Sequence, residues 1–191
     1  KYRDTPEFRN VEHVSYVDAD MQLVDTLRKG KTNCVVELMH AIDRLKDYRN
    51  MSDSLVRLNL MYVIHIVGDM HCPSHVKYPG CKSGRADLNG KKMSYHAMWD
   101  WGVLDGAHGW SYSEYRLLLD TFSKREKAGM AKGTPREWLY ETAVACRVIY
   151  DWQRADGTYG KQFVTDTYLL PERQLILASY RLAAVLNDLF G

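Results

Sequence analysis

Histidine and aspartate side chains gather in the middle of the sequence, in a pattern that could bind metal ions. Four of the seven histidines lie between positions 65 and 96: His65, His71, His75 and His96. Asp69 and Asp100 each follow a histidine by four positions. Side chains at i and i+4 share one face of a helix, so each His–Asp pair could hold one ion. An isolated pair is more often a hydrogen bond or surface ion pair, but two pairs together with His75 favour a metal centre.

The types of ligand favour a catalytic metal over a structural one. Imidazole and carboxylate without thiolate suit a zinc ion that keeps open positions for water and substrate. Three aromatic residues lie around the second pair: Tyr95, Trp99 and Trp101. They could stack against nucleic-acid bases, but aromatic residues at helical spacing more often belong to the core. We therefore expect them to be core residues.

Apolar periodicity predicts that helices position these side chains. We expect helices over residues 33–48, 52–70, 94–101, 113–127, 134–150 and 171–189. Pro73 makes continuation of the second helix unfavourable, and residues 76–93 are expected to form a long loop. The segment Val14 to Val17 alone is strand-like. The predicted fold class is therefore all-α, with residues 1–191 in a single multi-helix domain.

Composition agrees with one globular domain. The chain has 191 residues, of which 46% are hydrophobic and 26% charged. The formal net charge of +2 is too small for nucleic acid to be bound by bulk charge alone. No apolar run approaches the roughly 20 residues that a membrane span needs. Because the chain begins at Lys1 without an initiator Met or a signal sequence, we expect a processed or truncated product.

The cysteines leave two possibilities open. There are four, Cys34, Cys72, Cys81 and Cys146, and no CxxC pair, which disfavours a cysteine-rich zinc ribbon. Two disulfides in an oxidising compartment and four buried thiols are both compatible with this number.

Two motifs resemble those of a known family. Residues 65–75 read HIVGDMHCPSH and residues 95–100 read YHAMWD. Together they resemble the paired signature of zinc-dependent single-strand-specific nucleases of the S1/P1 type, which share an all-helical fold with bacterial zinc-dependent phospholipase C. Residues 180–187 are similar to the family's closing helix, so the resemblance covers nearly the whole chain. It implies a phospholipase C/nuclease-like fold.

The resemblance also implies a cluster of up to three zinc ions that neutralise phosphate charge and activate water. His65 and Asp69 would hold one zinc, and Asp69 would bridge to a second. The third would be held by the set His75, His96 and Asp100. Asp69 and Asp18 are the implied catalytic residues, with Asp18 orienting the attacking water. His71 is not a ligand in the family, so we expect it to pack or to support a ligand.

The N-terminal part departs from the family pattern. Family members begin with a zinc-binding Trp, followed by a His and later an Asp, and this chain contains none of the three at matching positions. We therefore expect that it lacks the family's N-terminal segment. Ser15 stands where the family has a further zinc-binding His, and His13 is a candidate substitute ligand. One zinc site is complete, and we expect the chain by itself to be catalytically impaired.

The resemblance further implies disulfides, Cys34 with Cys146 and, closing the long loop, Cys72 with Cys81. A secreted or periplasmic location would follow, and we expect a monomer.

The expected function is zinc-dependent hydrolysis of phosphodiester bonds in single-stranded DNA or RNA, as an endonuclease and also as a 3′-nucleotidase. Two alternatives stay open. The first is an impaired family member that binds a ligand or partner, as Ser15 would indicate. The second is a zinc-dependent phospholipase C with the same zinc ligands, for which an apolar rim would replace a base-stacking pocket.

Overall fold

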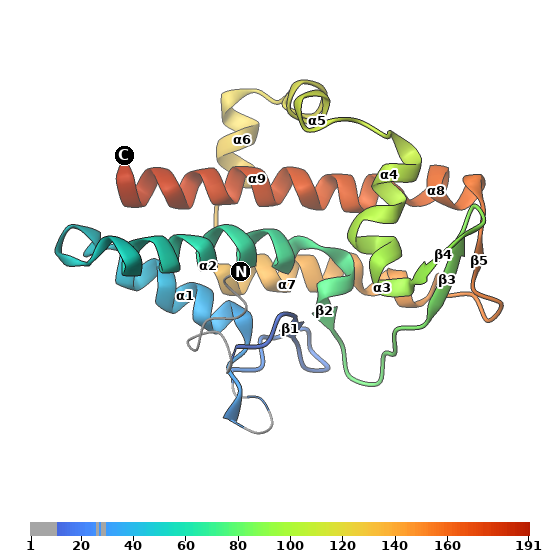
Figure 1. The fold of residues 1–191 in the computed structure, drawn as a ribbon, viewed down its shortest axis with the longest axis horizontal. Coiled ribbons are helices and arrows are strands. Elements are labelled where there is room, and N and C mark those ends of the chain that lie inside the picture. The colour runs from blue at the N-terminus through green and yellow to red at the C-terminus, as the bar shows by residue number, and fades with distance from the viewer. Residues whose placement is uncertain (1–10, 26, 28–29) are drawn as a thin grey trace.

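The fold is built around long helices that pack side by side. The computed structural model describes residues 11–25, 27 and 30–191. Its central helix α2 (Asp53–His71) contacts three others: α1 (Cys34–Leu45), α7 (Pro135–Cys146) and α9 (Leu169–Phe190). Figure 1 shows α2 and α9 running side by side along the long axis of the molecule. The predicted all-α class is confirmed.

Helix α1 begins where the sequence predicts it. The Asn33 side-chain oxygen accepts a hydrogen bond from the Val35 backbone N–H, as an N-cap does. The Asn33 amide also donates to the backbone oxygens of Tyr16 and Val24, which ties the N-terminal loop to the helix start. Leu38 and other residues on one face of α1 are fully buried against α2. The cap and this apolar face together fix α1 in the core.

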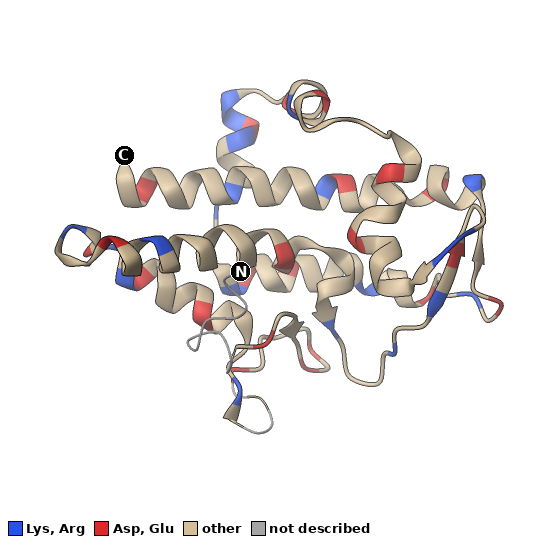
Figure 2. Cartoon of the chain, in the orientation of Figure 1, with Lys and Arg blue, Asp and Glu red and all other residues tan. Residues whose placement is uncertain are grey.

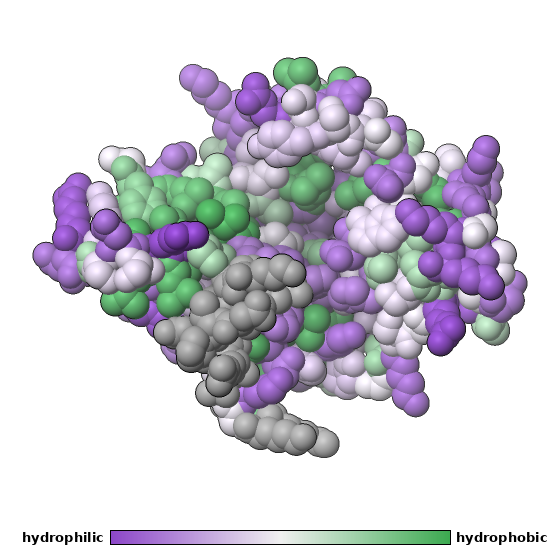
Figure 3. Space-filling model, viewed as in Figure 1, coloured by the Kyte–Doolittle hydropathy of each residue, from purple (hydrophilic) through white to green (hydrophobic). Residues whose placement is uncertain are grey.

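Helix α2 carries its buried residues mainly in its C-terminal half. Val63, Val67 and Met70 have no exposed surface, whereas Leu55 and Ile64 are about half exposed. Figure 3 shows hydrophobic residues gathered on the surface over the N-terminal part of α2. The end of α2 that leads to the histidine motif is therefore the firmly packed end.

A short 3₁₀ turn, Pro73–His75, follows α2 directly. Cys72 between them has an extended backbone, with ψ of 126°. Proline lacks an N–H and disfavours a helical conformation in the residue before it, so the chain leaves the helix here. The predicted end of this helix near residue 70 is confirmed.

Residues 76–93, predicted to be a loop, contain most of the strands. Strand β2 (Val76–Lys77) pairs in parallel with β1 (Ser15–Tyr16), which lies in the segment predicted to be strand-like. Strand β3 (Arg85–Leu88) pairs with β4 (Lys91–Ser94) in antiparallel fashion and with β5 (Thr158–Tyr159) in parallel. The loop prediction was therefore wrong in part.

The β3–β4 hairpin has a signal in the sequence that the loop prediction did not include. Asn89 and Gly90 form its two-residue turn, with φ of 52° and 85°. Asn-Gly is the preferred pair for a type I′ turn, because both positions need positive φ. The apolar run that usually flanks such a turn is weak here, since β4 begins with two lysines.

The predicted helix over 94–101 is longer and less regular than expected. It comprises α3 (Tyr95–Ala97), a π-helical segment Met98–Gly102 and α4 (Val103–Ala107). Tyr95 and Trp99 are 1% exposed, so the core interpretation of these two is confirmed. Trp101 is 40% exposed, and the Lys91 ammonium lies over its ring, 4.3 Å from the ring centre. The core interpretation was therefore wrong for Trp101.

The remaining predictions of helices need three changes. The stretch 113–127 is two helices, α5 (Tyr112–Leu119) and α6 (Lys124–Met130), because a capping box at Ser123 starts a new helix. The stretch 134–150 ends as a 3₁₀ turn after α7. Helix α8 (Lys161–Thr167), not predicted, precedes α9.

Charged side chains of both signs are interspersed over the ribbon (Figure 2), which agrees with the small net charge of +2. Among the described residues, no helix combines the length and apolar character required to cross a membrane.

Candidate metal centre

Helix α2 brings the first predicted pair together. The His65 Nε2 and Asp69 Oδ2 atoms are 2.7 Å apart, one helical turn from each other. Burial raises the pKa of Asp69, but its contacts with the His65 and His75 rings outweigh burial and hold that pKa well below its usual range. Asp69 is therefore an anion at neutral pH.

His75 lies between the two aspartates. Its Nδ1 is 3.3 Å from Asp69 Oδ2, and its Nε2 is 3.5 Å from Asp100 Oδ1. Burial alone would lower the pKa of His75, but the contacts with Asp100 and Asp69 raise it to about 9. The 3₁₀ turn after α2 thus places one imidazole where it links two carboxylates that are far apart in the sequence.

The second predicted pair is not arranged as the i,i+4 spacing suggests. Within the described residues, His96 and Asp100 form no ion pair; the His96 ring stacks on His75, with centroids 4.6 Å apart. Burial, followed by the nearby His75 charge, lowers the pKa of His96. Asp100 belongs to the π-helical segment, whose wider turn shifts its side chain from the α-helical register. It faces His75 instead, and this contact lowers its pKa.

Cys72 joins this group, although the sequence indicated only a disulfide or a buried thiol for it. Its Sγ lies 3.6 Å from Asp100 Oδ1. The donor atoms of Cys72, His75 and Asp100 all lie within 4.8 Å of one another. The signal in the sequence was the position of Cys72 inside the histidine motif, three residues before His75.

Buried donor atoms without hydrogen bonds support a cation at this place. Asp69 Oδ2, His75 Nδ1 and His75 Nε2 are buried from solvent, and their close approaches do not have hydrogen-bond geometry. Burying polar atoms without partners costs about 1–3 kcal/mol each, so such a group usually has an ion or a water between its members. The donor set of imidazole, carboxylate and thiol fits a zinc-like ion.

The three N-terminal candidates have different surroundings. His13 shares a small cavity with His65 and Asp69, as a substitute ligand would require. Ser15 is completely buried, with its Oγ 3.3 Å from Cys34 Sγ. Asp18 is exposed, and its Oδ1 accepts hydrogen bonds from the Asp20 and Gln22 backbones. Asp18 thus stabilises a turn, and its role in orienting water stays a prediction.

The implied disulfides are not formed. All four cysteines are free thiols. Cys34 contacts Ser15, and Cys72 contacts Ser74 and Asp100, so each packs against polar groups other than its implied partner. Burial raises the pKa of both Cys34 and Cys72 to about 12.

His71 has the packing role expected for it. Burial, reinforced by the Arg181 charge, lowers its pKa to about 4, so the ring is neutral. Its Nδ1 donates to the Val67 backbone oxygen over 2.7 Å, and its Nε2 accepts from Arg181 over 2.9 Å. His71 therefore ties α2 to α9.

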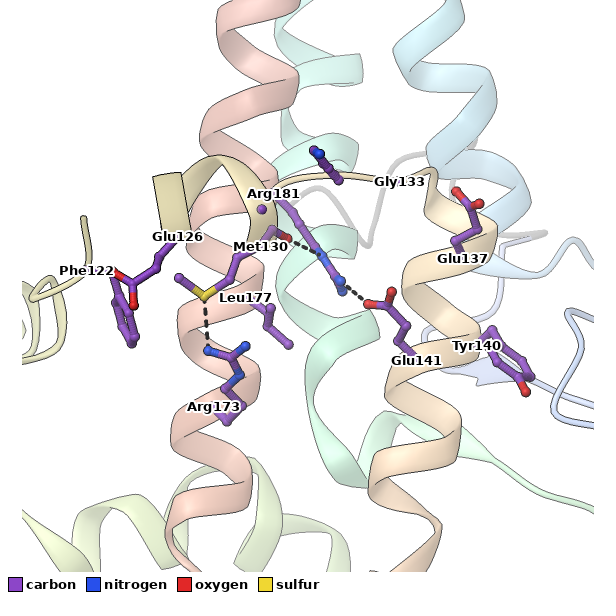
Figure 4. A pocket seen from close by; sticks show the side chains of 12 residues that line it. Phe122, Glu126, Met130, Gly133, Glu137, Tyr140, Glu141, Arg173, Leu177 and Arg181 are labelled. Carbon is purple, nitrogen blue, oxygen red and sulfur yellow. Dashed lines mark hydrogen bonds and ion pairs between the residues drawn. The ribbon is translucent and has the colours of Figure 1, made fainter. Parts of the chain in front are cut away.

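Arg181 also reaches a cavity of about 830 Å³ beside α6, α7 and α9 (Figure 4). Its guanidinium is ion-paired with Glu141 and donates to the Met130 backbone oxygen. Arg173, in the same cavity, points toward the Met130 sulfur. Because the buried arginine already has partners on three sides, it serves to join the helices around this cavity.

Comparison with known proteins identifies the family. The family model of the S1/P1 nucleases matches residues 1–191, so the chain belongs to this family. Endonuclease 4 of Arabidopsis thaliana is 25% identical, over 100% of this chain and 69% of its own length. Endonuclease 2 of the same plant is 27% identical over 84% of this chain and 63% of its own length. Nuclease S1 of Aspergillus oryzae is 27% identical over 72% of this chain and 50% of its own length. The resemblance inferred from the two motifs is confirmed.

Proposed function

We propose that this protein hydrolyses phosphodiester bonds of single-stranded nucleic acid with zinc as its cofactor, and that the chain by itself, in which Ser15 replaces a zinc-binding His, does so only weakly. The observation that carries the proposal is the buried His75 between Asp69 and Asp100, with donor atoms that lack hydrogen bonds, in a chain of the S1/P1 nuclease family. Relatives named endonuclease and nuclease support nucleic acid as the substrate.

His65, Asp69, His75, His96 and Asp100 would hold zinc ions, with His13 as a candidate substitute ligand. Such an ion neutralises phosphate charge and activates water near neutral pH. In the metal-free chain, His75 is protonated, so it must release a proton before it can act as a ligand.

Two neighbouring side chains, His96 and Lys77, would interact with the substrate. His96 has a lowered pKa and is neutral at pH 7, so it can accept a proton or donate a lone pair. Lys77, on β2, is near enough for its charge to lower that pKa further. A lysine at this rim would attract a phosphate without a strongly basic surface elsewhere.

The test is cleavage by the EDTA-treated chain before and after zinc is added. The substrates are single-stranded DNA, RNA, the matching duplex DNA, a 3′-nucleotide and a short-chain phospholipid. We expect zinc to restore a weak cleavage of the single strands. The cleavage rate of His75→Ala should be at least ~100-fold lower than that of the wild type, since loss of even a residue that supports a metal ligand lowers activity by 10–100-fold. His40→Ala, at an exposed site on α1, is the control and should cleave at the rate of the wild type.

Two results would replace the proposal. Zinc binding without cleavage of any substrate would make the chain a binding member of a nuclease family. Cleavage of the phospholipid alone would make it a phospholipase C.

A further inference from the structure

The Cys72 thiol occupies the position that a third metal ligand would take. Its Sγ is 3.6 Å from Asp100 Oδ1, and His75 Nε2 is 3.5 Å from the same oxygen. For a tetrahedral zinc ion, with Zn–S of ~2.3 Å and Zn–N and Zn–O of ~2.0–2.1 Å, the corresponding separations are ~3.6 Å and ~3.4 Å. These two separations therefore already match those of zinc ligands, and the donor atoms of all three residues lie within 4.8 Å of one another.

A second observation points to an ion at this place. The His75 side chain is 8% exposed, and its Nε2, which faces Asp100, has no hydrogen bond. Cys72 could instead donate its S–H to Asp100, but that bond would leave His75 Nε2 unsatisfied. An ion satisfies all three donors at once.

The arrangement of His96 strengthens the argument for Cys72. The two imidazoles are stacked, with 25° between their planes. Ring lone pairs lie in the ring plane, so nearly parallel stacked rings do not aim them well at one point. The described residues whose donor atoms group with His75 are Cys72 and Asp100, and the His75 atom that faces Asp100 is Nε2.

We propose that the Cys72 thiolate is a direct ligand, with His75 and Asp100, of a metal ion in this centre. The proposal rests on the proposed function and adds to it a thiolate ligand. On binding, the S–H bond gives its proton to solvent and the sulfur lone pair forms the bond to the metal, with no change in oxidation state. A thiolate makes the site select zinc, cobalt or cadmium over magnesium or calcium.

The first experiment is cobalt substitution. Metal-free protein is titrated with Co²⁺, and the thiolate-to-cobalt charge-transfer absorption in the near ultraviolet is recorded. We expect this band in the wild type and in Cys81→Ser, the control, and at least a tenfold weaker band in Cys72→Ser. Zn²⁺ should displace it. A wild type that binds cobalt without the band, or a band that persists in Cys72→Ser, overturns the proposal.

The second experiment needs no variant. The rate of alkylation of Cys72 by iodoacetamide is followed by peptide mass spectrometry, with Cys81 as the internal reference. We expect Zn²⁺ to slow alkylation of Cys72 by tenfold or more relative to Cys81, and Mg²⁺ to have no effect. If zinc binds but leaves the ratio of the two rates unchanged, Cys72 is not a ligand, although the metal centre stands. If no zinc binds to the wild type, the proposed function fails together with this inference.

Discussion

The stability of the metal-free protein should depend on the protonation of His75. Its pKa is raised from 6.5 to about 9 by Asp100 and Asp69. A histidine with a raised pKa stabilises the folded state fully below its unfolded pKa, and this contribution is lost as the pH rises through the folded pKa. The loss should therefore occur between about pH 6.5 and pH 9.

A shift of this size corresponds to ~3 kcal/mol, because each pKa unit is ~1.4 kcal/mol. The Asp100 side chain is 44% exposed, so solvent screens part of its charge, and we expect ~2–3 kcal/mol. Neighbouring groups do not mask the effect. Asp69 and Asp100 have lowered pKa values and stay ionised. Cys72, with a pKa of 9.0 in the unfolded chain and about 12 in the folded one, contributes equally in the wild type and in His75→Gln, so the comparison of the two removes it.

The assay is urea unfolding in EDTA at about pH 6 and about pH 9.5. The free energy of unfolding of the wild type should fall by ~2–3 kcal/mol more than that of His75→Gln between the two values. His40→Gln, at an exposed site, should behave as the wild type does. An equal fall in the wild type and in His75→Gln would refute the linkage of His75 to the two aspartates.

Three further changes test the packing around the centre. Leu38→Ala, at a fully buried position of α1, should destabilise the fold by ~2–5 kcal/mol in urea unfolding, and a loss under 1 kcal/mol would contradict its place in the core. Gly90→Ala should lower the free energy of unfolding by ~1 kcal/mol, because φ at this position is 85°. Gly129→Ala, in helix α6 with open space around it, should raise the free energy of unfolding by a similar amount. The same change in stability for both variants would refute the assigned turn at Gly90. Arg181→Met should lower the free energy of unfolding by ~3 kcal/mol, because it leaves the buried partners of Arg181 unsatisfied. Arg173→Met, at an exposed site, should lower it by under ~1 kcal/mol. A larger loss for Arg173→Met than for Arg181→Met would exclude the assigned role of Arg181.

Local signals accounted for the predictions that succeeded. Asn33, Pro73 and the Thr134 capping box each act within a few residues of the backbone, and they mark helix ends in the sequence itself. The capping box at Ser123 and the Asn89-Gly90 turn are local signals of the same kind. The first predicts that the stretch 113–127 is two helices, and the second predicts the β3–β4 hairpin. Strand β5 has no such signal, because its pairing with β3 joins segments about 70 residues apart.

The sequence by itself determined the helical class, the family motif and the contact of His65 with Asp69, because a helix brings residues four apart together whatever surrounds it. Only the tertiary structure decided which groups meet His75. Cys72 and Asp100 are 28 positions apart, and they meet because the 3₁₀ turn after α2 packs against the π-helical segment. That packing turns Asp100 toward Cys72 and stacks His96 on His75. Spacing along the chain does not encode these contacts, since they depend on how two irregular turns fit one another.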